Sequence, residues 1–320
     1  MKFAVLTGDR EKMGEVLKIQ NLKMHFPVKA GIFRRITHHL KAVDGVSLSI
    51  EQGKTLGLVG ESGSGKTSLG RSVMRLIEPT EGEILFYNQD LRTMPKKNLR
   101  HLRQNIQMIF QDPYESLNPR HTIQRILKEP FIVHRKSYTI DDIKYLIERV
   151  GLPADSLDRY PHEFSGGQRQ RIGIARAIAL NPKLIVCDEP VSALDVSVQS
   201  QILNLLLDLQ REMNVSYLFI AHNLAVVKHM SDDIAVMYLG KIVEYTSSSE
   251  LYKQPLHPYT KALMASKEKI FLKGEISSSI NLPKGCRFQS RCPYVMERCC
   301  NEEPGLKSKN ADDHLVACHY

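Results

Sequence analysis

A glycine-rich octapeptide, GESGSGKT, occupies residues 60–67 and matches the pattern G-x4-G-K-S/T. Glycines let a backbone fold tightly around phosphate oxygens and turn its N–H groups toward them. In this pattern Lys66 reaches the outer phosphates, and the Thr67 hydroxyl binds Mg²⁺. A chance glycine-rich turn is the alternative, which the strand expected just before the loop disfavours. We therefore predict a nucleotide site that includes Gly60, Glu61, Ser62, Gly63, Ser64, Gly65, Lys66, Thr67 and Ser68.

A second chemical feature is an apolar run, LIVCDEP at 184–190, that contains two neighbouring carboxylates. Successive strand residues point to opposite sides, so Asp188 and Glu189 cannot share one role. Solvated acids in a turn would be the ordinary interpretation. Beside a phosphate loop, Asp188 is expected to hold Mg²⁺ and Glu189 to orient or deprotonate the attacking water.

The elements that must position these residues alternate between strand and helix. Apolar runs predict strands at 56–60, 183–190 and 216–222, and 15–26, 46–50 and 81–90 also read as strands. Residues 196–213 predict a helix, since Ile202, Leu205, Leu206 and Leu209 fall on one face. Strand, helix, strand in this order indicates a parallel sheet with crossover helices. Residues 112–180 look largely helical, and 27–41 look like a basic loop.

Composition and charge limit the classes of protein to which the chain can belong. The chain has 320 residues, 42% of them hydrophobic and 25% charged, which is ordinary globular usage and suggests about two domains. With 44 Lys and Arg against 35 Asp and Glu, the net charge of +9 permits contact with nucleic acid, an anionic membrane surface or phosphorylated ligands. No apolar run is long enough to span a bilayer, and the first residues do not resemble a secretory signal, so we expect a cytoplasmic location.

Five of the six cysteines fall near the end of the sequence, after a linker-like stretch at 273–285. In a reducing cytosol such a cluster indicates metal ligation before disulfides. Four thiolates suit either zinc or an iron–sulfur cluster, and the spacing matches neither a zinc ribbon nor a common ferredoxin run. Cys187 is expected to be a buried apolar residue and Cys300 a spare; the proposed ligands are Cys286, Cys292, Cys299 and Cys318.

Further motifs give a family resemblance. FSGGQ at 164–168, IFQDP around Gln111, SALD at 192–195 and FIAHN around His222 follow the phosphate loop and the acidic pair in an order that resembles the ATPase subunits of ATP-binding cassette (ABC) transporters. Stretches such as FQDPYESLNPR at 110–120, HPYTKALM at 257–264 and the cysteine tail resemble the oligopeptide and dipeptide importer branch, specifically its F-type second ATPase.

The resemblance implies the fold and the domains. It implies an α/β P-loop NTPase with an antiparallel β subdomain and a helical subdomain at about 112–180. The cassette would span 14–265, and a small cysteine-rich extension would span 266–320. Resemblance to cysteine-tailed importers also favours a 4Fe–4S cluster in that extension, with zinc as one alternative and free or disulfide-bonded cysteines as another.

The resemblance also implies residue roles. Gln111 would contact Mg²⁺ or the attacking water, and His222 would donate to the γ-phosphate, which makes Glu189, His222 and Gln111 the expected catalytic set. A signature segment, here Ser165, Gly166, Gly167 and Gln168, caps the γ-phosphate held by the opposite cassette, and Asp195 turns the chain at that seam. Phe26, with Phe33 second, would stack on adenine.

The resemblance implies a peripheral subunit that hydrolyses ATP at the cytoplasmic face of the cell membrane. Its partners would be a second, paralogous ATPase, two transmembrane permeases and, indirectly, an extracytoplasmic solute-binding protein. The cargo would be oligopeptides or dipeptides; nickel, oligosaccharides or opines are alternatives within the same branch. A soluble cassette ATPase acting on nucleic acid is disfavoured, because the chain has one cassette and no long heptad run. A structural or regulatory cassette with a catalytically inactive site is disfavoured, because Glu189, Gln168 and His222 are all present.

Overall fold

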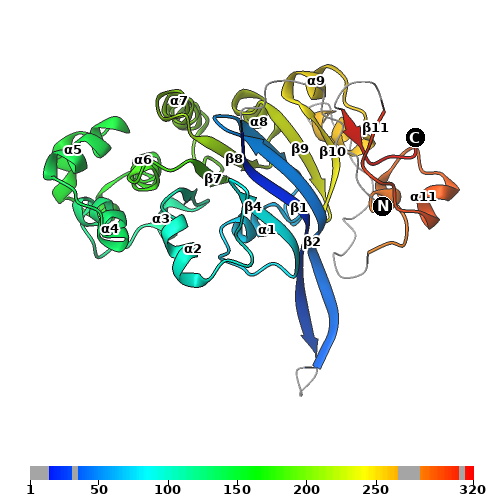
Figure 1. Ribbon diagram of the computed structural model, residues 1–320. Coiled ribbons are helices and arrows are strands. Elements are labelled where there is room, and N and C mark those ends of the chain that lie inside the picture. Colours follow the sequence, from blue (N-terminus) through cyan, green and yellow to red (C-terminus); the bar gives the residue numbers. More distant parts are fainter. Residues whose placement is uncertain (1–13, 31–34, 266–281, 310–313) are drawn as a thin grey trace.

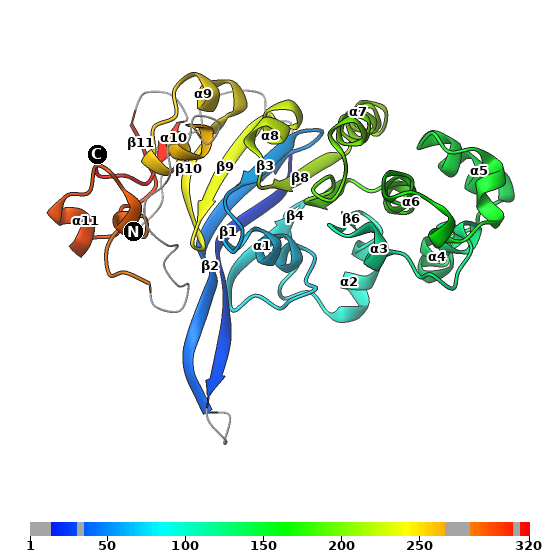
Figure 2. The same cartoon turned by 180° about the vertical axis from the view of Figure 1, so that it is seen from behind.

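The protein is described by a computed structural model that covers residues 14–30, 35–265, 282–309 and 314–320. Two sheets form its centre, with a helical part on one side and the C-terminal segment on the other (Figures 1 and 2). Among the described residues, one sheet is four-stranded and antiparallel, in the order β2-β1-β4-β5. Its strands are β1 (Glu15–Ala30), β2 (Arg35–Glu51), β4 (Glu81–Phe86) and β5 (Gln89–Asp90).

The second sheet has eight strands within the described residues, in the order β11-β12-β10-β9-β3-β8-β7-β6. The run from β9 to β6 is parallel, as the strand–helix–strand pattern predicted, and the other three strands pair antiparallel. Its strands are β3 (Thr55–Val59), β6 (Ile106–Ile109), β7 (Leu184–Asp188), β8 (Ser216–Ala221), β9 (Asp233–Tyr238), β10 (Lys241–Ser247), β11 (Lys307–Ser308) and β12 (Leu315–Val316).

The central strands are apolar on both faces because each face is covered. In β7, Leu184 and Val186 pack into the core shared with the antiparallel sheet and helix α1 (Lys66–Val73). Ile185 and Cys187 point the other way, into the core formed with helices α6 (Gly166–Ile178) and α7 (Val196–Met213). Cys187 is completely buried, which confirms its expected role as a small apolar residue.

Helices occupy both outer layers. The helix predicted at 196–213 is α7 (Val196–Met213), and Ile202, Leu206 and Leu209 of its predicted face are buried, with Leu205 partly buried. The remaining helices are α2 (Lys96–Leu102), α3 (Pro113–Ser116), α4 (Ile123–His134), α5 (Ile140–Arg149), α6 (Gly166–Ile178), α8 (Leu224–Met230), α9 (Ser248–Lys253), α10 (Pro258–Met264) and α11 (Glu297–Asn301). Short 3₁₀ turns are η1 (Ala154–Asp158), η2 (Pro161–Glu163) and η4 (Gln289–Arg291).

The expected basic loop at 27–41 was wrong in large part. The described residues of this stretch extend β1 and β2 into a long antiparallel hairpin, with Pro27 opposite His39 and Val28 opposite His38. The hairpin projects well beyond the body of the molecule (Figures 1 and 2). Backbone pairing overrode the loop-like composition, and residues 31–34 lie outside the described part.

The C-terminal segment, described at residues 282–309 and 314–320, joins the sheet through strand β12, which pairs with β10. Beneath this pairing the buried carboxylate of Glu244 accepts hydrogen bonds from the N–H groups of Leu256 and His257, at 2.7 and 2.9 Å. It also contacts Nε2 of His314 at 2.7 Å. A buried carboxylate with three partners is a strong local anchor, because leaving it unpaired would be costly.

In the described part of the chain, none of the helices is both long enough and apolar enough to cross a bilayer. The α/β architecture with an antiparallel sheet and a helical part agrees with the sequence prediction. The division into a cassette ending at 265 and an extension from 266 stays a prediction.

Acid should lower the stability of the fold around the C-terminal segment, because of the titration of His257. Burial lowers the pKa of His257 to about 3, and a hydrogen bond from its ring to the backbone of Ala317 only partly opposes this. The unfolded chain, with an ordinary value near 6.5, binds the proton first, so stability present above pH 6.5 is lost as pH falls toward 3. The measurement is the thermal unfolding midpoint at pH 7.5 and at pH 5.

The matched control is His257→Asn, which keeps an acceptor for the N–H of Tyr259 but does not titrate. Its midpoint should fall less between the two pH values than that of the native chain. Equal losses for the two proteins would contradict the assignment.

Candidate functional site

The loop at 60–67 connects β3 to α1 and is wedged against backbone on two sides. A Cβ on Gly60 would lie 2.1 Å from the carbonyl oxygen of Met237, and one on Gly65 would lie 1.9 Å from that of Ala42. Gly65 also has a φ of 107°, a conformation that favours glycine. The two glycines of the motif are therefore required by close packing as well as by the path of the loop.

Lys66 is buried beneath this loop. Its Nζ donates to the carbonyl oxygens of Gly60 at 2.7 Å and Glu61 at 2.9 Å, and to the Ser64 hydroxyl at 3.4 Å. Burial lowers the pKa of Lys66, opposed by the negative charges of Glu189, Asp188 and Glu61. A buried ammonium on a glycine-rich loop at the start of a helix is well suited to hold phosphate oxygens.

Thr67 and Asp188 meet at the start of α1. The Thr67 hydroxyl donates to Oδ1 of Asp188 at 2.9 Å, although the two residues are 121 positions apart. Burial raises the pKa of Asp188, which the Thr67 hydrogen bond and the charges of Arg71 and Lys66 oppose. A hydroxyl and a carboxylate side by side, next to a phosphate loop, form a donor set that fits Mg²⁺.

Glu189 gathers two other predicted residues. Its Oε2 accepts a hydrogen bond from the Gln111 amide at 3.2 Å and lies 3.0 Å from Nδ1 of His222. The residue has left strand β7 with a φ of 47°, which is uncommon for a non-glycine residue. This turn aims Glu189 at Gln111 and His222 while Asp188 faces Thr67, so the two carboxylates have different neighbours; their separate catalytic roles stay a prediction.

Space remains beside these groups. A cavity of about 50 Å³ lies against Glu189 and His222, with Ser192, Gln199 and Asn223 among its lining residues. A cavity of this size with several polar side chains in its wall has room for ordered water. The carboxylate of Glu189 and the imidazole of His222 on its wall can position a water molecule and accept its proton.

The signature segment begins helix α6 in the helical part. The Ser165 hydroxyl accepts from the N–H of Gln168 at 3.3 Å, and the Gln168 side chain accepts from the N–H of Ser165 at 3.0 Å. This reciprocal pair is a capping box. Gly166 and Gly167 follow at the exposed helix start, and α6 lies apart from α1 in both views (Figures 1 and 2). The structure therefore does not bring this segment to the chain's own phosphate loop.

Two other predicted residues have local roles in the structure. Asp195 is the N-cap residue of α7, with its carbonyl oxygen accepting from the N–H of Gln199 at 2.8 Å. Phe26 lies on β1, opposite Leu40, and packs partly buried against the core between the two sheets. Phe33, the second candidate for adenine stacking, lies outside the described residues. Adenine stacking by Phe26 stays a prediction.

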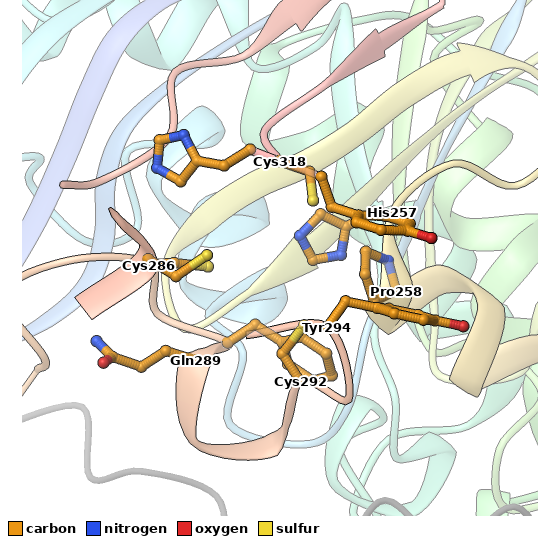
Figure 3. A pocket seen from close by; sticks show the side chains of 11 residues that line it. His257, Pro258, Cys286, Gln289, Cys292, Tyr294 and Cys318 are labelled. Carbon is orange, nitrogen blue, oxygen red and sulfur yellow. The ribbon is translucent and has the colours of Figure 1, made fainter. Parts of the chain in front are cut away.

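The predicted 4Fe–4S cluster, and zinc as its alternative, were wrong. Cys286, Cys292, Cys299 and Cys318 do line one cavity, together with His257 and other residues (Figure 3). All four are free thiols, and among the described residues no group of three or more His, Cys, Asp or Glu side chains is arranged to hold a metal ion.

The correction has a physical reason in the space between the thiols. The cavity encloses about 10 Å³, about the space of one water molecule, which cannot hold four irons and four sulfides. Burial raises the pKa of Cys286 to about 11 and that of Cys292 above its ordinary value, which favours the protonated thiols. The C-terminal segment is held by ion pairs, strand pairing and Phe288 rather than by a metal.

Sequence reasoning missed three residues near the phosphate loop. The Tyr259 hydroxyl accepts from the N–H of Glu61 at 2.8 Å, and Arg291 binds the Glu61 carboxylate. Arg287 binds Asp44 on β2. The sequence signal for these contacts was a pair of arginines four residues apart within CRFQSRC. The cysteines alone guided the interpretation of this stretch.

Two family models match the chain. The model described as ABC transporter matches residues 43–192, and the model described as oligopeptide/dipeptide transporter, C-terminal region, matches residues 243–299. The first covers the phosphate loop, Gln111, the signature segment and the acidic pair. The second covers Tyr259, Arg291 and three of the clustered cysteines.

Curated relatives are similar over nearly the whole chain. An oligopeptide transport ATP-binding protein of Bacillus subtilis, AppF, is 52% identical across 95% of this chain and 97% of its own length. The oligopeptide transport ATP-binding protein OppF of Salmonella typhimurium is 48% identical, over 96% and 97%. The dipeptide transport ATP-binding protein DppF of Haemophilus influenzae is 44% identical, over 98% and 99%.

A solved structure shares the cassette architecture. It is a dimeric, post-hydrolysis state of the ATP-binding cassette MJ0796 bound to ADP and Pi, 26% identical, with a TM-score of 0.64. It covers 72% of this chain and 98% of its own.

Thiol reactivity should follow burial in the six cysteines. Cys300 is exposed, Cys286, Cys292 and Cys318 are partly buried, and Cys187 is completely buried with its pKa raised by desolvation. We expect Cys300 to react with a maleimide at least ~10-fold faster than Cys187, which should react only on unfolding. Peptide mass spectrometry of timed samples measures this, with Cys300→Ser removing the fast phase. Fast labelling of Cys187 in the native protein would contradict the packing of β7.

Proposed function

Since the chain belongs to the ABC transporter family of ATP-binding cassettes, we propose that it energises a membrane importer for oligopeptides or dipeptides. The chain is an ATPase of this family, with ATP as substrate and Mg²⁺ as cofactor. Relatives named for oligopeptide and dipeptide transport, aligned over nearly their full length, support the peptide cargo. The observation that carries the proposed chemistry is the convergence of Gln111 and His222 on Glu189, next to Thr67 and Asp188.

In the proposed mechanism each group of residues has a separate role in binding or hydrolysing ATP. The N–H groups of the loop at 60–67 and the ammonium of Lys66 hold the phosphate oxygens of ATP. Thr67 and Asp188 would hold Mg²⁺, with Gln111 as a further ligand, and the bound ion would supply positive charge beside the phosphates. Glu189 accepts the proton of the attacking water, and His222 donates a hydrogen bond to the γ-phosphate. Phe26 stacks on adenine.

The signature segment acts across a dimer. Ser165, Gly166, Gly167 and Gln168 present a serine hydroxyl and free N–H groups at the start of α6, which suits a phosphate. Because α6 and α1 lie apart, these groups serve ATP held by an opposing cassette, with Asp195 near the seam. Two ATP molecules would then lie between two cassettes, and closure around them would drive the membrane partners.

The proposed partners follow from the same family. This chain would pair with a second, paralogous ATPase and dock on two transmembrane permeases at the cytoplasmic face of the membrane. A solute-binding protein outside the membrane would deliver the peptide. The chain itself would not touch the cargo.

Substitution of Glu189 tests the proposed general base. Glu189→Gln keeps the size of the side chain and removes its basicity, so ATP should bind while hydrolysis falls by ~10²–10⁴-fold. The measurement is phosphate release by the assembled transporter, together with ATP binding. A loss of less than about tenfold would remove Glu189 from this role.

Lys66→Ala serves as the contrasting variant, because it should weaken ATP binding itself. Unchanged ATP affinity in Lys66→Ala would contradict the proposed phosphate site. The pair of variants therefore separates binding from chemistry.

Isolated cassettes should hydrolyse ATP poorly, since each phosphate loop lacks an opposing signature segment. Phosphate release by the purified chain should rise when the paralogous ATPase and the permeases are added. Mass measured by light scattering in the same samples identifies the active species. Robust turnover by a demonstrated monomer would rule out sharing of the site between cassettes.

A further inference from the structure

The C-terminal segment places an arginine directly against the phosphate loop. Arg291 ends the turn η4, and its side chain is only 5% exposed. Its Nη1 donates to Oε2 of Glu61 at 2.7 Å, and its Nη2 donates to Oε1 at 3.0 Å. Glu61 is the second residue of the loop at 60–67. Paired, parallel hydrogen bonds of this kind are the strongest and most directional that arginine makes with a carboxylate.

Glu61 is held at its backbone as well. Its N–H donates to the Tyr259 hydroxyl at 2.8 Å, and its carbonyl oxygen accepts from Nζ of Lys66 at 2.9 Å. The position of Lys66, the phosphate-binding cation, is thus coupled through Glu61 to Arg291. A shift of the Glu61 carboxylate would move the backbone that Lys66 contacts.

Arg291 is itself fixed by aromatic packing. The ring of Phe288, three residues earlier, is buried against Tyr238 and Tyr259, with ring centroids 5.3 and 5.5 Å apart. The Arg291 guanidinium lies 5.9 Å from the centroid of the Tyr238 ring. Packing that restricts the rotamer of an arginine reduces the entropy lost when it binds its carboxylate.

A neighbouring arginine binds backbone that contacts the loop at a second point. Arg287 donates to the Asp44 carboxylate and to the carbonyl oxygen of Leu239. The next residue, Gly240, donates its N–H to the carbonyl oxygen of Ser64 at 2.8 Å, within the loop. The segment therefore contacts the loop's surroundings on two sides, and Arg291 makes the direct contact.

Charge explains why this contact matters for nucleotide. ATP carries several negative charges, and Glu61 adds another beside the loop that must receive them. Arg291 neutralises Glu61 and holds its carboxylate in one place. Without Arg291 the carboxylate would repel the phosphates and compete with them for Lys66, at the low effective dielectric of a partly buried site.

We propose that Arg291 is a positioning residue for ATP binding, through which the C-terminal segment sets the affinity of the phosphate loop by clamping Glu61. This rests on the proposed function of residues 60–67 as the phosphate site. It assigns the segment a role in nucleotide binding that a docking surface for partners alone would not have.

The experiment measures the dissociation constant of a fluorescent ATP analogue with Mg²⁺ on the purified full-length chain. Arg291→Gln should raise it about tenfold, equivalent to ~1.4 kcal/mol. Arg291→Lys, which keeps the charge but not the two-pronged geometry, should raise it about threefold. The matched control is Arg298→Gln, because Arg298 makes the same paired contact with Glu302 at 2.7 and 3.0 Å on the exposed surface of the same segment. That control should stay within twofold of the native chain.

A second-site rescue separates positioning from general loosening of the segment. In an Glu61→Gln background the carboxylate charge is gone, so adding Arg291→Gln should change the dissociation constant by less than threefold. A purely structural defect would persist in the double variant and would overturn the proposal, as would native affinity in Arg291→Gln. Lys66→Ala tests the phosphate site separately from the role of Arg291. If Lys66→Ala leaves the ATP affinity unchanged, the proposed phosphate site is wrong. If only Arg291→Gln leaves the affinity unchanged, the phosphate site stands and the proposed role of Arg291 is rejected.

Discussion

The phosphate loop is confined between two carbonyl oxygens, and the rest of the site depends on that confinement. Gly60 lies against Met237 of β9 and Gly65 against Ala42 of β2, so closely that neither position has room for a Cβ. Ala42 and Met237 belong to different sheets, and α1 lies between those sheets. The packing of the two sheets on α1 therefore fixes where the loop can lie, and with it Lys66 and Thr67.

The carboxyl ends of parallel strands then supply the remaining groups. Gln111 follows β6, Asp188 ends β7 and His222 follows β8, so strands remote in sequence deliver their side chains to one edge of the sheet. Glu189 is the exception to regular geometry, since its positive φ turns it away from the direction that Asp188 takes. Backbone strain at such a position is retained where the surrounding contacts determine it, here the contacts to Gln111 and His222.

The sequence allowed much of this to be predicted, because the signals were local. The helix at 196–213 shows the 3.6-residue period from Ile202 to Leu209, and the loop at 60–67 follows directly from its pattern. The hairpin made by β1 and β2 could not be read from residues 27–41, since strand pairing there depends on the partner strand rather than on composition. The four cysteines were correctly grouped around one cavity, but their spacing carries no information on its volume or on how the thiols are arranged, and these two properties exclude the cluster. Arg291 and Glu61 are 230 positions apart, and no local period links them.

Strand order also has a consequence for synthesis of the chain on the ribosome. Strand β10 is an edge of the central sheet until β12 pairs with it, and Glu244 on β10 is completed by His314, 70 residues later. While those residues are being translated, the nascent sheet presents open backbone N–H and C=O groups and a buried carboxylate without its imidazole partner. An exposed sheet edge is a template for intermolecular strand pairing, so this interval is the one in which a chaperone would protect the nascent chain most. Late closure of the sheet thus links correct folding of the nucleotide-binding body to translation of a segment that follows it in the chain.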